Sequence, residues 1–186
     1  KHIVKTGLSL VGKVPYFWGG KSPAGWNDEW TTPRLVTAAG STPSGTILGH
    51  EFAGIVEAVG DGVDTIKTGD RVCVDPNQLC NQCYYCKSGI GHFCEQMTGI
   101  GTGVNGGFAQ YCVVPQSQVY KIADTTSYEA AAMTEPVACC LHGIDMCNIS
   151  CGDTVAVMGG GMIGMIMLQL AKISGAGKLI MIEPVA

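Results

Sequence analysis

Four closely spaced cysteines constrain this chain more than any other feature of its sequence. The run "CNQCYYCKSGIGHFC" places them in a C-x2-C-x2-C-x7-C pattern. A tetrahedral thiolate site needs four sulfurs about 2.3 Å from one ion, and cysteines on short turns reach that arrangement at little loop-closure cost. We therefore expect a structural zinc ion bound by Cys80, Cys83, Cys86 and Cys94.

Disulfide-linked or inert buried thiols and an iron–sulfur cluster are the alternatives for these cysteines. All ten cysteines lie between Cys73 and Cys151, and the sequence shows no secretory leader, which disfavours a disulfide scaffold. The bacterial ferredoxin pattern ends C-x3-C-P, whereas seven residues separate Cys86 from Cys94 here. Zinc is the preferred interpretation, and both alternatives stay open.

Composition excludes several classes of function. The 186 residues are 46% apolar and 14% charged, which is enough core material for one large or two small domains. A net charge of −4 gives no basic surface for nucleic acid or an anionic membrane. The most apolar run, Val155–Leu168, contains four glycines and is shorter than the ~18–20 residues that span a bilayer. We expect a soluble, cytoplasmic protein without these partners.

A strand, a glycine turn, a helix and a second strand are predicted near the C-terminus. The first strand is Thr154–Met158, the helix ends near Ser174, and the second strand ends at Glu183. In a dinucleotide-binding unit, such glycines permit the tight turn, the approach of the pyrophosphate and close helix–strand packing. A carboxylate about 20 residues on binds the ribose and repels the 2′-phosphate of NADP. The predicted NAD site comprises Gly159, Gly161, Ile163, Gly164 and Glu183.

Three further stretches carry a family resemblance. The run from Gly49 to Val63 reads G-H-E-x2-G-x5-G-x2-V, "GVNGGFAQYCVVP" follows the cysteines, and "TEP" occupies Thr134–Pro136. With the cysteines and the glycine turn, these stretches make residues 47–186 resemble the zinc-dependent medium-chain alcohol dehydrogenases, and "TEP" resembles their polyol and sorbitol dehydrogenase branch. The resemblance implies hydride transfer from a secondary alcohol or polyol to NAD. It also implies a catalytic zinc site with His50 and Glu135 as ligands and Glu51 as a ligand or a close partner of a ligand.

The resemblance implies an α/β fold in two parts. Residues 47–150 are expected to form a partial GroES-like, β-rich catalytic domain with the zinc lobe, and residues 151–186 the first βαβ unit of a Rossmann domain. Homo-oligomers are implied as well. The family carries a cysteine ligand ahead of G-H-E, but no cysteine precedes Cys73 here. A catalytically inactive zinc-binding fragment is therefore the alternative to an active enzyme.

The N-terminal segment has a different resemblance. "VPYFWGGKS" (Val14–Ser22) resembles the opening of NlpC-type cell-wall cysteine peptidases, so residues 1–46 are expected to have a separate origin, with a peptidase fragment as a further alternative. "WNDEW" (Trp26–Trp30) resembles threonine dehydrogenases, which keeps a divergent dehydrogenase N-terminus open. His92 in the lobe and His142 on a helix predicted over 128–146 are expected to pack locally or face solvent.

Overall fold

The computed structural model describes residues 2–6 and 45–184, which belong to two compact units, Lys1–Ala132 and Met133–Ala186. Most of the N-terminal segment 1–46, including its peptidase-like and "WNDEW" stretches, lies outside the described residues, so its separate origin stays a prediction. Among the described helices, none is long and apolar enough to cross a membrane.

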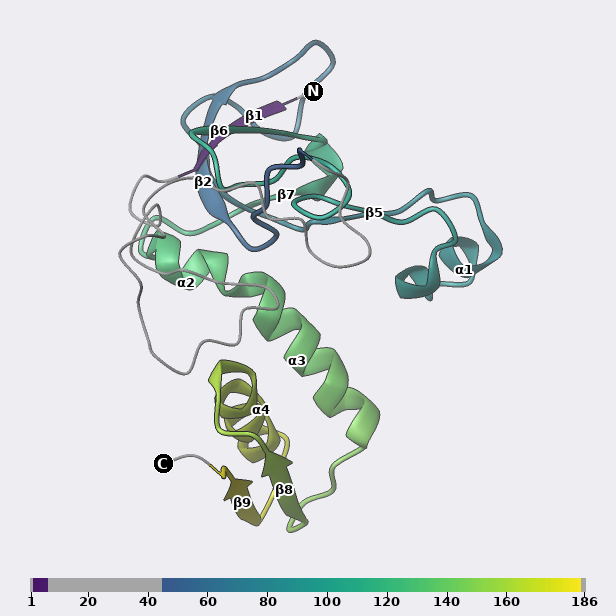
Figure 1. Cartoon of the computed structure of the whole chain (residues 1–186), viewed down its shortest axis with the longest axis vertical. Helices are drawn as coiled ribbons and strands as arrows, with labels where there is room; N and C mark the ends of the chain where they lie inside the picture. Colours follow the sequence, from purple (N-terminus) through teal and green to yellow (C-terminus); the bar gives the residue numbers. More distant parts are fainter. Residues whose placement is uncertain (1, 7–44, 185–186) are drawn as a thin grey trace. The chain divides into compact units, whose positions relative to one another are not determined.

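A five-stranded antiparallel sheet forms the centre of the first unit (Figure 1), with the strand order β6-β1-β2-β3-β7. Its strands are β1 (His2–Thr6), β2 (Ala53–Ala58), β3 (Arg71–Val74), β6 (Tyr111–Val114) and β7 (Val119–Lys121), and the short helix η3 (Gln116–Gln118) precedes β7.

Alternating side chains of this sheet pack on its two faces. Val72 and Val74 belong to the main core, whereas Cys73 between them packs on the other face against Ala53 and Ala131. This is the two-residue period of a strand that is buried on both sides. The main core consists of Phe52, Val56, Ile66, Val72, Val74, Ile100, Cys112 and Val114.

The cysteine-rich segment between Asn77 and Gly99, the zinc lobe expected from the sequence, projects from this sheet as an arm (Figure 1). Strands β4 (Asn77–Gln78) and β5 (Thr98–Gly99) pair at its base. Helix α1 (Tyr84–Lys87) and the 3-10 turn η2 (Gly91–Phe93) lie between them. Neither helix contains a buried residue. Apolar burial therefore contributes little to the arm, which suits a segment ordered by a metal ion.

Arg71 holds the segment between β7 and helix α2 (Tyr128–Ala132). Its guanidinium donates hydrogen bonds to the carbonyl oxygens of Ala123, Asp124 and Thr126 at 2.8, 2.7 and 2.5 Å. Its Nε donates to the hydroxyl of Tyr128 at 3.2 Å, and its Cζ lies 4.5 Å from the centre of that ring. One planar cation thus satisfies three loop carbonyls and fixes the start of α2.

The second unit contains the βαβ arrangement expected from the sequence. Strands β8 (Thr154–Met158) and β9 (Lys178–Ile182) are parallel, with α4 (Met162–Ile173) between them in the chain. Helix α3 (Thr134–Cys147) precedes them and contacts α4. A methyl group at Gly143 would lie 3.5 Å from Met167, so a small residue permits the close approach of the two helices.

The single helix predicted over 128–146 is two helices in the structure. The chain leaves helical hydrogen bonding at Met133, between α2 and α3. Pro136 lies in the first turn of α3 and has no N–H to donate to the preceding turn, and the new helix begins with Val137 N–H donating to Met133 at 3.0 Å. The prediction missed this break, although Pro136 was a local signal for it.

The division between the units falls at Met133, whereas the sequence placed a domain boundary at residue 150. The difference arises from α3, which precedes that boundary but packs on α4. The ranges 47–150 and 151–186 are the two domains that the family resemblance implies, and they stay a prediction.

Candidate functional site

The four lobe cysteines converge on one point. Their Sγ atoms all lie within 4.8 Å of one another, with Cys86 3.9 Å from Cys80 and 3.5 Å from Cys83. Sulfurs about 2.3 Å from a tetrahedral zinc ion are separated by about 3.8 Å, so the arrangement fits that ion. The four thiols are free rather than disulfide-bonded.

Backbone N–H groups point at these sulfurs. Cys80 Sγ accepts hydrogen bonds from the N–H groups of Gln82 and Cys83 at 3.4 and 3.3 Å, and Cys94 Sγ accepts one from Cys80 at 3.4 Å. Backbone N–H groups of Cys86 and Glu95 lower the pKa of Cys83 to about 6, whereas desolvation and the neighbouring thiols raise the pKa of Cys86 to about 12. These contacts favour the thiolate form of Cys83 and the protonated form of Cys86.

His92 is not part of this thiol cluster. Its ring lies 4.4 Å from the ring of Phe93, and its side chain is exposed. The ring of Phe93 lies in turn 5.9 Å from that of Tyr85. His142 on α3 is also exposed.

A glycine-rich loop fixes the backbone around His50. Residues 106–108 donate three backbone hydrogen bonds to residues 47–49, at 2.7–2.9 Å. A methyl group on Gly106 would lie 2.3 Å from the carbonyl oxygen of Gly49, and one on Gly101 would lie 2.4 Å from the same atom. Gly49 itself has φ +111° and is closed in by Phe108. The segment before His50 therefore packs backbone against backbone, which only glycine allows.

The hydrogen bond of His50 selects its tautomer. Nδ1 lies 2.9 Å from the carbonyl oxygen of Ile100, which accepts a hydrogen bond and has no proton to give. Nδ1 is therefore the protonated nitrogen of the neutral ring, and the lone pair resides on Nε2. A histidine oriented in this way is typical of a metal ligand. Glu51 follows directly and is partly buried.

Glu135 lies in the first turn of α3 and is partly buried. The thiol of Cys139, one turn further on, donates to its Oε1 at 3.4 Å. The sequence did not single out Cys139, although its i,i+4 spacing from Glu135 was a usable signal. His50 and Glu51 belong to the first unit and Glu135 to the second, so a shared zinc site stays a prediction.

The glycine turn of the second unit has the geometry of a tight strand–helix connection. Gly159 has φ +99°, and its N–H donates to Ile182 at 2.8 Å. A methyl group on Gly164 would lie 1.8 Å from the carbonyl oxygen of Gly159, so helix α4 packs directly on the turn. A methyl group on Gly161 would meet nothing within 4 Å, so that side of the turn is open at the N-terminus of α4.

Glu183 contacts this turn directly. Its Oε2 accepts a hydrogen bond from the N–H of Gly160 at 2.6 Å. The predicted ribose carboxylate is therefore held beside the glycine turn, where it also closes in Gly160. Ile163 lies in the first turn of α4, and its carbonyl oxygen is 3.9 Å from Cys140 Sγ.

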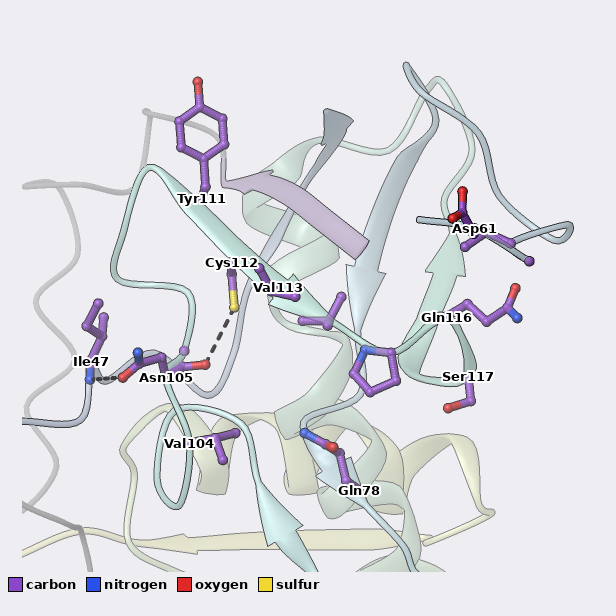
Figure 2. A pocket seen from close by; sticks show the side chains of 15 residues that line it. Ile47, Asp61, Gln78, Val104, Asn105, Tyr111, Cys112, Val113, Gln116 and Ser117 are labelled. Carbon is purple, nitrogen blue, oxygen red and sulfur yellow. Dashed lines mark hydrogen bonds between the residues drawn. The ribbon is translucent and has the colours of Figure 1, made fainter. Parts of the chain in front are cut away.

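A pocket of about 900 Å³ lies elsewhere in the first unit, alongside β6 (Figure 2). The carbonyl oxygen of Asn105 accepts a hydrogen bond from Cys112 Sγ at 3.6 Å, and its side chain accepts one from Ile47 N–H at 3.0 Å. Burial raises the pKa of Cys112 to about 11, so its thiol stays protonated. None of the predicted site residues lines this pocket.

Comparison with known proteins agrees with this geometry. Residues 27–124 match the family described as "Alcohol dehydrogenase GroES-like domain". The chain belongs to this family, within the zinc-dependent medium-chain dehydrogenases. The match begins at residue 27, so for residues 27–46 it favours the alternative of a divergent dehydrogenase N-terminus over a separate origin.

Two curated relatives and one solved structure illustrate the similarity. An L-threonine 3-dehydrogenase of Francisella tularensis subsp. mediasiatica (strain FSC147) is 38% identical over 156 residues, 84% of this chain and 42% of that protein. A D-arabitol-phosphate dehydrogenase of Enterococcus avium is 42% identical over 132 residues, 70% of this chain and 38% of that protein. A structure from Sinorhizobium meliloti 1021, described as a zinc-binding dehydrogenase bound to NADP, is 44% identical with a TM-score of 0.73, covering 76% of this chain and 41% of that one. The chain thus spans less than half the length of these relatives.

Proposed function

We propose that this chain is part of a zinc-dependent dehydrogenase that transfers hydride between a secondary alcohol or polyol and NAD. The observation that carries the proposal is the hydrogen bond between His50 Nδ1 and Ile100, because it presents Nε2 as a metal-binding lone pair. The family match and the glycine turn support the same reading.

Two metal sites with different roles belong to the proposal. Cys80, Cys83, Cys86 and Cys94 hold a structural ion, and the donor set of four thiols is closed. His50, Glu51 and Glu135 supply imidazole and carboxylate ligands for a catalytic ion. Three protein ligands are typical of a site with a position open to substrate. The bound zinc and NAD supply Lewis acidity and the hydride acceptor.

The chain's own residues position the cofactor and the substrate. The open side of Gly161 at the N-terminus of α4 accommodates the pyrophosphate. Glu183 accepts hydrogen bonds from the ribose hydroxyls and repels a 2′-phosphate, which favours NAD. The relative bound to NADP is the reason to measure this preference directly.

The substrate class follows from the relatives. Two of them are named for L-threonine and D-arabitol phosphate, and both compounds carry a secondary hydroxyl group. We propose a secondary alcohol or polyol for this chain, a homo-oligomeric assembly, and a cytoplasmic location, all three from the family resemblance.

Zinc stoichiometry after exhaustive dialysis tests the proposal. We expect about two zinc ions per chain, falling to about one in Glu135→Ala and in His50→Ala, because the cysteine lobe keeps its own ion. Cys86→Ala should have the opposite effect: it should lose the ion of the cysteine lobe and keep the ion of the second site. A parent protein with one ion would instead support the alternative of an inactive zinc-binding fragment.

Calorimetric titration with NAD and NADP tests the cofactor. The proposal predicts saturable binding of NAD that weakens in Glu183→Ala, and weaker binding of NADP than of NAD. Tighter binding of NADP by the parent would contradict the assignment of Glu183.

A further inference from the structure

Helix α3 carries two adjacent cysteines whose thiols make different contacts. The thiol of Cys139 is exposed and donates to Glu135 Oε1 at 3.4 Å. The thiol of Cys140 is buried and donates to the carbonyl oxygen of Ile163, in the first turn of α4, at 3.9 Å. Neighbouring residues of a helix point about 100° apart, so one thiol faces along α3 to Glu135 and the other faces α4.

The contact of Cys139 orients a carboxylate. The two oxygens of a glutamate carboxylate are equivalent, and the carboxylate group rotates easily about its terminal side-chain bond. A donor fixed one helical turn away selects Oε1 as its acceptor and favours metal binding through Oε2. Cys139 is suited to this contact because positions i and i+4 of a helix lie on the same face.

Cys140 supports the same arrangement from the other side. Its contact with Ile163 ties α3 to the helix that begins at the glycine turn. The helix that bears Glu135 is thereby fixed against the predicted nucleotide site within one unit.

We propose that Cys139 is a positioning residue for Glu135, whose thiol holds the carboxylate in the orientation that binds the catalytic metal ion. The inference rests on the proposed function, because it takes Glu135 to be a metal ligand. The residue acts through Glu135 and needs no contact with the substrate.

Competitive zinc titration of the 186-residue chain against a chromophoric chelator tests this role. Three variants are compared with the parent: Cys139→Ala removes the donor, Cys139→Ser restores a hydroxyl donor, and Cys147→Ala is a matched control, since Cys147 is also exposed on α3. The ion of the cysteine lobe serves as an internal reference in every titration, and the thermal midpoint of each variant is recorded.

We expect Cys139→Ala to weaken the second zinc site about 10-fold, the lower end of the range for partners of metal ligands. Cys139→Ser should bind within about 3-fold of the parent, since a hydroxyl is the stronger donor of the two. Cys147→Ala, the lobe ion and the thermal midpoints should be unchanged. Serine rescue separates an orienting hydrogen bond from simple packing.

Two results would overturn the inference in distinguishable ways. If the parent binds two ions and Cys139→Ala binds the second as tightly, or Cys139→Ser fails to restore it, the positioning role is wrong and the proposed function stands. If the parent binds only the lobe ion, the metal role of Glu135 fails, and the inference fails with it.

Discussion

His50 Nδ1 lies 2.9 Å from the carbonyl oxygen of Ile100, fifty residues further along the chain. Ile100 is fully buried in the main core, so its carbonyl group cannot turn away to solvent. The tautomer of a candidate metal ligand is thus set by the packing of the first unit. The loop that brings Ile100 to His50 is held by glycines that touch the backbone of Gly49.

Gly106→Ala should disrupt this packing. The added methyl group would lie 2.3 Å from the carbonyl oxygen of Gly49, and backbone atoms must move to relieve the contact. We expect a loss of about 1–3 kcal/mol in the free energy of unfolding, as for other overpacked sites, and loss of the second zinc ion with the lobe ion retained. Gly103→Ala in the same loop is the control, because its methyl group would meet its nearest neighbour at 3.4 Å. Equal stability of the two variants in urea denaturation would contradict this packing.

Alanine at two glycines of the nucleotide turn should have different effects on stability and on NAD binding. Gly164→Ala would place a methyl group 1.8 Å from the carbonyl oxygen of Gly159 and should destabilise the second unit. A methyl group at Gly161 would meet nothing within 4 Å, and the backbone there has an ordinary φ of −68°. The unfolding free energy of Gly161→Ala should therefore stay within about 0.5 kcal/mol of the parent. The same methyl group should obstruct the pyrophosphate and weaken NAD binding. Full NAD affinity in a stable Gly161→Ala variant would place the nucleotide elsewhere.

Arg71→Lys should be costly despite its retained charge. An ammonium group cannot donate in one plane to Ala123, Asp124 and Thr126 while stacking on Tyr128. We expect a loss of about 1–3 kcal/mol, since the exposed carbonyl groups of Ala123 and Asp124 and the partly buried one of Thr126 lose their shared planar donor. Lys121→Ala, which removes an ion pair with Asp70, should cost less than about 1 kcal/mol. Chemical denaturation of both variants provides the comparison, and similar losses would show that Arg71 is not the stronger contact.

Asp70 should stabilise the first unit in a pH-dependent way. Hydrogen bonds from the Lys121 side chain and the Lys67 N–H hold the pKa of this carboxyl below its usual 3.8. A depressed pKa in the folded state stabilises the protein above the unfolded pKa, and this stabilisation is lost as pH falls through the lower, folded value. The difference in unfolding free energy between the parent and Asp70→Asn should therefore be constant near neutral pH and shrink below pH 3.8. A difference that grows on acidification would have the wrong sign.

Local patterns were sufficient for two parts of the molecule. The four cysteines lie within fifteen consecutive residues, so their spacing alone predicted the cluster that the structure contains. The strand predicted over Thr154–Met158 is β8, and the following helix ends at Ile173, one residue before the predicted Ser174. In both parts the decisive contacts are made between residues near in sequence, whose turn and period preferences are readable directly.

Elements that depend on distant partners were not readable. Nothing in the sequence indicated that Arg71 would bind the carbonyl groups of residues 123–126. Backbone carbonyl groups are present in every residue, so a contact between a side chain and a remote carbonyl leaves no pattern in the sequence.

The sequence by itself determined the family, the zinc lobe and the glycine turn, because each is carried by a compact motif whose residues act on their near neighbours. Only the tertiary structure decided which nitrogen of His50 bears the proton, which amide Glu183 binds and which thiol faces Glu135. Those outcomes depend on the angle and distance at which separate segments meet, and packing of the whole unit sets both.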